Sequence, residues 1–150
     1  MSIRTCSLIL MSALLAGCNM GPKSSYGFTL PDGDAAVGKD VFTAMSCNGC
    51  HSVAGMPELR EGFDPELKVV LGGKTTRIKS YGELVTSIIN PSHKLARGYK
   101  DEDVSIEGMS KMTNYNDVLT VSELIDLVAF LQAQYELELH PRTTYPPYTY

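Results

Sequence analysis

The stretch Cys47-Asn48-Gly49-Cys50-His51 decides how this 150-residue chain folds. Two cysteines separated by two residues, with a histidine directly after them, bring together three side chains that bind metals or form covalent bonds. On a helical turn, residues three apart lie on the same side, so both thiols point the same way with the imidazole beside them. The stretch therefore predicts a site that attaches a group through two sulfur atoms and contacts it through one nitrogen.

The spacing C-x-x-C-H is typical of covalent haem c attachment, in which two thioethers join the protein to one porphyrin edge and the histidine binds iron. Three alternatives are a thioredoxin-like redox pair, half of a zinc site, and a structural disulfide. A redox pair needs a βαβ context that the sequence lacks, and zinc needs two more ligands at suitable spacing. A disulfide leaves His51 unexplained. We therefore expect one covalently bound haem c on Cys47, Cys50 and His51.

Helix signals dominate the rest of the chain, and alternating strand patterns are almost missing. Asp34 can cap a helix that carries Val37, Val41 and Phe42 and runs toward Cys47. Further along, Ser80 and Glu83 have the spacing of a capping box for a helix over 81–89, which Asn90-Pro91 ends.

The same signals predict one more helix after Thr120, with Glu123 as its capping-box partner. Apolar residues then recur at spacings of three and four, and the helix is expected to continue to about Leu139. The sequence thus predicts an all-α domain over 34–140, with few helices and long loops. So few helices make a marginal core, which indicates that the haem itself fills the middle.

Beyond the attachment motif, residues 35–135 resemble class I cytochromes c. Gly38 and Phe42 match the glycine and aromatic of that family's N-terminal helix, and Leu127 and Phe130 match its C-terminal helix. The resemblance implies that these two helices cross closely, because glycine permits the approach and the aromatic rings fill the crossing. It also implies a cytochrome c-like fold wrapped around one covalent haem.

The resemblance also suggests the remaining ligands. Gly55-Met56-Pro57-Glu58-Leu59 is similar to the family's Gly-x-Pro-x-Leu loop, so the Pro57 carbonyl is expected to accept a hydrogen bond from the second ring nitrogen of His51. Met112-Thr113-Asn114-Tyr115 resembles the Met-Pro-x-Phe/Tyr segment, with Thr113 where proline is usual. Met112 is therefore the expected second iron ligand and Met109 the alternative, while His93 is expected to be a surface residue.

The segment 84–91, followed by Gly98-Tyr99, looks like the haem c domains of terminal oxidase subunit II. Compared with those domains, the interval from Tyr99 to Met112 is longer and carries Asp101-Glu102-Asp103 and Glu107. Such acidic loops can steer a basic partner. Most charge runs are simply solvated, and from the sequence we favour that interpretation here.

The N-terminus has the pattern of an export signal, an apolar stretch over 8–15 that is too short to span a bilayer. Leu14-Leu15-Ala16-Gly17-Cys18 resembles the lipobox of bacterial lipoproteins, which implies a signal peptide over 1–17 and an acylated Cys18. Residues 18–33 are then a flexible membrane tether, and 141–150 form an extended Pro/Tyr-rich tail. The expected location is a bacterial membrane facing the periplasm, with the outer membrane or cell surface also open.

A haem iron held by both His51 and Met112 has no open position for a substrate, so we expect an electron carrier cycling between Fe(III) and Fe(II) and no enzyme. Its expected partners are a redox donor and a redox acceptor in a respiratory chain. The alternative is a fixed electron-transfer subunit of a larger respiratory or dehydrogenase complex. A formal net charge of −4 argues against nucleic-acid binding.

Overall fold

The computed structural model describes residues 28, 30–62, 67–77 and 79–138. The predicted signal peptide over 1–17, Cys18, most of the tether and the tail over 141–150 lie outside the described residues. The chain divides into two compact units, Met1–Leu30 and Pro31–Tyr150, and every element below belongs to the second unit. In this described part, no helix combines the length and the apolar character needed to cross a bilayer.

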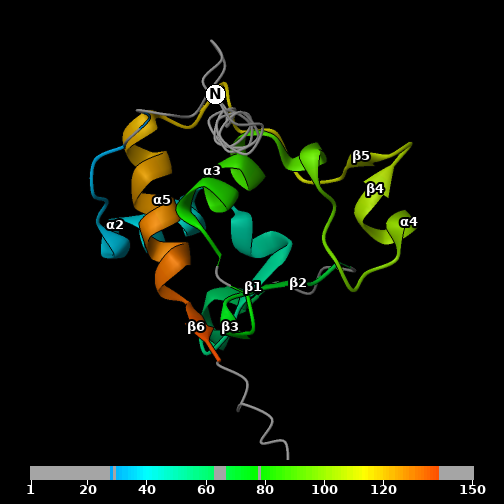
Figure 1. The fold of residues 1–150 in the computed structure, drawn as a ribbon, viewed down its shortest axis with the longest axis horizontal. Helices are drawn as coiled ribbons and strands as arrows, with labels where there is room; N and C mark the ends of the chain where they lie inside the picture. The colour runs from blue at the N-terminus through cyan, green and yellow to red at the C-terminus, as the bar shows by residue number, and fades with distance from the viewer. Residues whose placement is uncertain (1–27, 29, 63–66, 78, 139–150) are drawn as a thin grey trace, which may run out of the picture. The chain divides into compact units, whose positions relative to one another are not determined.

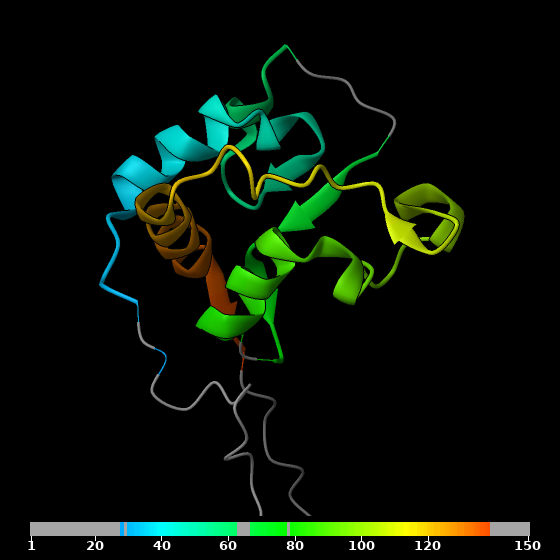
Figure 2. The ribbon, with the colours of Figure 1, turned by 90° about the horizontal axis from the view of Figure 1, so that it is seen from above.

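Helices α2 (Ala35–Ala44) and α5 (Val121–Ala133) pack across each other (Figures 1 and 2). Asp34 caps α2, because its carboxylate accepts a hydrogen bond of 2.7 Å from the amide of Ala36. The start of α5 carries a complete capping box between Thr120 and Glu123. Both helix starts are therefore confirmed, each fixed by a side chain that satisfies otherwise unpaired amides.

The crossing depends on a glycine. A Cβ atom on Gly38 would overlap the carbonyl oxygen of Asp126 and lie 2.8 Å from Phe130 Cβ. Next to this contact, the rings of Phe42 and Phe130 lie 5.7 Å apart at 56°, a tilted aromatic pair that is almost fully buried. The predicted crossing is confirmed, although Val37 of the same helix is 45% exposed and does not belong to the core.

We expect Gly38→Ala to lower the free energy of unfolding by about 2–3 kcal/mol, because the added methyl forces α2 and α5 apart. The matched control is Gly82→Ala, where a Cβ meets nothing within 4 Å and alanine favours the helix by up to about 1 kcal/mol. Chemical denaturation of both variants measures the difference. Equal stability of the two would show that the close helix contact is not needed.

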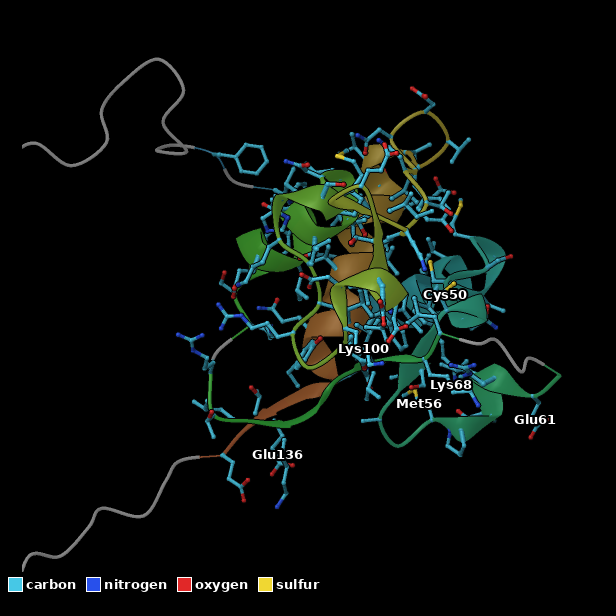
Figure 3. The ribbon with its side chains drawn as sticks, turned by 90° about the vertical axis from the view of Figure 1, so that its right-hand side faces the viewer. Cys50, Met56, Glu61, Lys68, Lys100 and Glu136 are labelled. Carbon is cyan, nitrogen blue, oxygen red and sulfur yellow. The ribbon has the colours of Figure 1, made fainter. Side chains whose placement is uncertain are left out.

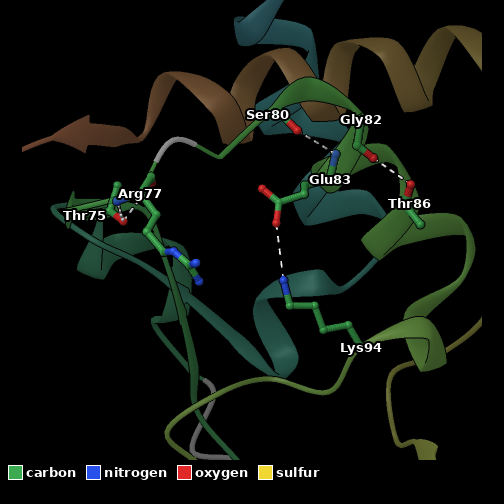
Figure 4. A network of polar contacts seen from close by, with 7 residues as sticks. All are labelled: Thr75, Arg77, Ser80, Gly82, Glu83, Thr86 and Lys94. Carbon is green, nitrogen blue, oxygen red and sulfur yellow. Dashed lines mark hydrogen bonds and ion pairs between the residues drawn. The ribbon is translucent and has the colours of Figure 1, made fainter. Parts of the chain in front are cut away.

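Helix α3 (Tyr81–Ile89) begins after Ser80 and ends at Asn90, as predicted. The Ser80 hydroxyl accepts from the Glu83 amide, but the Glu83 carboxylate lies 3.4 Å from Lys94 Nζ, so only half of the predicted capping box forms (Figure 4). The ammonium of Lys94 lowers the pKa of Glu83. This exposed ion pair ties the segment after α3 back to its first turn and contributes little to stability.

The all-α prediction is incomplete, because six short strands pair in the described part of the chain. Two pairs are parallel and one is antiparallel: β1 (His51–Val53) with β2 (Val69–Leu71), β3 (Gly73–Thr75) with β6 (Tyr135–Leu137), and β4 (Ser105–Ile106) with β5 (Met109–Ser110). Strands of two or three residues are too short to show alternation in the sequence. The remaining elements are one short helix and three 3-10 turns: α4 (Asp101–Val104), η1 (Cys47–Gly49), η2 (Pro57–Arg60) and η3 (Pro91–His93).

The last helix is shorter than predicted, since α5 ends at Ala133 and not near Leu139. The carbonyl oxygen of Gln134 accepts a 2.8 Å hydrogen bond from the Gly73 amide, and the chain continues as β6 alongside β3. Backbone pairing with a distant strand therefore overrides the helical periodicity after Ala133. Gly72 and Gly73 both have positive φ angles, which lets this turn reach Gln134.

Candidate metal centre

The motif cysteines lie on one tight turn, as their spacing predicted. The amide of Cys50 donates to the carbonyl of Cys47 at 3.2 Å, closing the 3-10 turn η1. Between them, Asn48 is only 3% exposed, and its side-chain amide donates to the Leu59 carbonyl at 2.7 Å. Asn48 thus fastens η1 to η2, a role that no pattern in the sequence indicated.

His51 follows the turn as the first residue of β1, and its Nδ1 lies 3.3 Å from the carbonyl oxygen of Val69. A carbonyl only accepts, so Nδ1 carries the proton and Nε2 keeps its lone pair. Burial lowers the pKa of His51, which keeps the imidazole neutral near pH 7, the form that binds metals. The Pro57 carbonyl was the expected acceptor, whereas pairing of β1 with β2 brings Val69 beside the ring in this structure.

A partly open cavity lies between the helices and the segment that follows β5. His51, Cys47 and Met112 line it together, which brings the nitrogen, one sulfur of the motif and a thioether to the same space. The other lining residues are mostly apolar: Phe42, Met45, Leu71, Leu84, Ser87, Ile88, Tyr115, Leu119, Leu127 and Leu131. A flat, largely apolar ring with a central metal fits these walls and this donor set.

The structure distinguishes the two candidate methionines. Met112 is half-buried and lines the cavity, whereas Met109 is 62% exposed on β5. The amide of Met112 donates to the hydroxyl of Ser110 at 3.1 Å, which holds the backbone at the cavity wall. His93 is exposed, with Nδ1 2.8 Å from the Asn90 carbonyl, so it lies at the surface as expected.

Tyrosines hold the walls of the cavity in place. The hydroxyl of Tyr115, three residues after Met112, donates to the carbonyl of Met45 at 2.9 Å and links this segment to the end of α2. The hydroxyl of Tyr99 accepts from the Val70 amide at 3.0 Å, which secures β2 beside β1. In the sequence both tyrosines stand out only as parts of motifs, because hydrogen bonds between distant segments leave no local pattern.

The geometry disfavours the alternatives for the cysteine pair. Both thiols are free, so no disulfide joins Cys47 and Cys50. Burial raises the pKa of Cys47 to about 11, and the neighbouring Cys50 adds to this shift, whereas a redox-active cysteine needs a lowered pKa. Within the described ranges, no three His, Cys, Asp or Glu side chains converge in the way that a zinc site requires.

An attachment turn, a neutral imidazole and a thioether around one apolar cavity define a protein that carries covalent haem. Residues 35–134 match the family model for cytochrome c, and the chain belongs to this family. No curated protein and no solved structure matches the chain. The family membership establishes covalently bound haem c as the cofactor, with Cys47 and Cys50 in the attachment positions.

When bound, the haem supplies a one-electron Fe(III)/Fe(II) couple. Cys47 and Cys50 would hold the porphyrin, and His51 and Met112 are the cavity residues with donor atoms for the iron. The hydrogen bond to Val69 fixes the tautomer and orientation of the His51 ring, and such partners tune a metal centre. Apolar side chains form most of the lining around this site.

Met112→Ala should abolish the weak charge-transfer absorption of methionine-ligated ferric haem. It should also lower the midpoint potential by on the order of 100 mV, within the range of about 0.8 V that axial ligands set. Met109→Ala is the matched control and should change neither property, because Met109 is exposed. The visible spectrum and a redox titration measure both, and a loss of the band in Met109→Ala instead would refute the assignment.

Proposed function

We propose that this chain is a membrane-anchored monohaem cytochrome that carries single electrons between redox proteins and does not catalyse a reaction at its iron. Membership of the cytochrome c family supports electron transfer through haem. The observation that carries the finer proposal is that His51 and Met112 line one cavity. If His51 and Met112 both bind the iron, no coordination site is left for oxygen, peroxide or a substrate.

The surroundings of the ligands support the same proposal. Met112 lies on a segment anchored at Ser110 and, through the hydroxyl of Tyr115, at Met45. His51 is held through Val69. Ligands fixed from outside the metal centre change position little when the iron changes oxidation state, which favours rapid electron transfer. A thioether ligand and an apolar pocket both raise the potential relative to water-exposed haem.

The reduced protein should bind carbon monoxide very slowly or not at all near pH 7, because Met112 occupies the only position available to it. A redox titration should in parallel give a single one-electron wave. Met112→Ala serves as the positive control and should bind carbon monoxide readily. Rapid binding by the unaltered protein would favour a gas sensor or a small haem enzyme and would contradict the proposal.

The membrane anchor of the proposal is a lipid on Cys18. Its support is the sequence Leu14-Leu15-Ala16-Gly17-Cys18 after an apolar export signal. Two or more acyl chains hold a protein firmly at a membrane, whereas one chain binds only marginally. The residues between Cys18 and the haem domain would keep the domain near the membrane, in the periplasm or at the cell surface. We propose a free carrier, with a fixed subunit of a respiratory complex as the competing arrangement.

Cys18→Ser should remove the protein from the membrane fraction or leave it uncleaved there, without changing its visible spectrum, because the haem site is separate in sequence. Mass spectrometry of the mature N-terminus provides the direct measurement. Ser7→Ala, within the signal segment, is the control and should leave acylation intact. An unacylated mature chain contradicts the anchor, and isolation in mild detergent at fixed stoichiometry with a catalytic subunit contradicts the free carrier.

A further inference from the structure

The hairpin of β4 and β5 presents two large apolar side chains to solvent. Ile106 and Met109 are 65% and 62% exposed, and they lie opposite each other in the antiparallel register. Residues that face each other in this way project from the same face of the ribbon, with Cβ atoms about 4.5–5.5 Å apart. Ile106 and Met109 thus form one apolar cluster, the hairpin patch.

The hairpin patch has a fixed position. Glu107 and Gly108 form its two-residue turn, and both have the positive φ angles, 52° and 79°, that such tight turns require. At the base, the amide of Ser110 donates to the hydroxyl of Ser92 at 3.0 Å, which fastens β5 to η3. Exposed apolar side chains gathered on an ordered protrusion are typical of surfaces that contact another molecule.

Acidic residues lie on the hairpin turn and on the helix directly before the hairpin. Asp101, Glu102 and Asp103 form the first turn of α4, and Glu107 lies at the tip of the hairpin. The acidic side chains in this region outnumber the two lysines. Lys100 Nζ lies 3.5 Å from the Glu102 carboxylate, whereas Lys111 donates to a backbone carbonyl. Figures 1 and 2 both show α4 and the hairpin apart from the crossing of α2 and α5. The charge complement of this protrusion is a basic surface.

The patch is also connected to the metal centre. Two residues separate Met109 from Met112 in the sequence, and the amide of Met112 donates to the Ser110 hydroxyl. Figure 3 looks at the side of the molecule that carries the hairpin and labels Lys100, directly before α4, and Cys50 of the attachment turn. A partner held at the patch would contact the segment that leads to the predicted iron ligand. Electron-transfer complexes are small, often below about 1,200 Å², so a few anchors suffice.

We propose that the hairpin patch docks a redox protein whose contact face carries lysine or arginine side chains around a small apolar centre. This inference rests on the proposed function, because only an electron carrier needs such a partner. It also changes the sequence interpretation of Asp101–Asp103 as a merely solvated face. The sequence could not show that Ile106 and Met109 are exposed next to these charges.

Stopped-flow electron transfer between the full-length holoprotein and mitochondrial cytochrome c, a basic redox protein, tests the proposal. The double variant Ile106→Ser/Met109→Ser should lower the second-order rate constant about fivefold without changing the midpoint potential. Asp103→Lys/Glu107→Lys should weaken the fall of the rate with rising ionic strength. The matched control Val118→Ser/Val121→Ser, with 63% and 65% exposed side chains, should leave the rate unchanged within about twofold.

Each other outcome has a separate meaning. An unchanged rate in Ile106→Ser/Met109→Ser overturns the docking site but leaves the electron carrier intact, whereas no redox couple in the unaltered protein overturns the proposed function. A shift of the midpoint potential in this variant would show a structural effect on Met112 and overturn docking. If Ile106→Ser/Met109→Ser loses a dimer that the unaltered protein forms in sedimentation, the patch binds a second copy of the chain. If this variant instead loses binding to phosphatidylcholine/phosphatidylglycerol vesicles, the patch binds lipid, and either result overturns the proposal.

Discussion

The tight turn over Cys47–Gly49 is the constraint on which the rest of the molecule depends, because it fixes both thiols and then His51 within a few residues. Asn48 fastens this turn to η2, and Val69 fixes the imidazole from β2. Cys47 and His51 thereby line one wall of an apolar cavity, and Cys50 lies on the same turn. The remaining elements line that cavity from other sides, and Met112 reaches it from the segment after β5.

Closure of the cavity depends on contacts between distant segments. Gly38 allows α2 to approach the backbone of α5, and the pair of Phe42 and Phe130 fills the space beside it. The Met112 segment is tied to the end of α2 through Tyr115. A domain of this size with few helices buries a limited apolar area. Covalent attachment of an apolar ring adds interior surface that the polypeptide alone does not provide, so folding and haem binding support each other.

Features encoded by local chemistry could be predicted from the sequence, and features set by distant pairing could not. Capping residues indicated the starts of α2, α3 and α5, whereas the helix crossing was implied by the resemblance of Gly38, Phe42 and Phe130 to class I cytochromes c. The early end of α5 and the short strands could not be predicted, because backbone pairing between remote residues determines them. The position of Val69 beside the His51 ring could not be predicted for the same reason, and the sequence pointed to Pro57.

A haem joined through two thioethers would form both the interior of this protein and its working centre. The most direct test is the pyridine haemochrome spectrum of the denatured full-length chain, after expression with the maturation machinery for c-type cytochromes, alongside its intact mass. We expect a c-type spectrum, with one haem per chain that remains attached after acid-acetone extraction. A colourless product, or a haem that extraction removes completely, would contradict it.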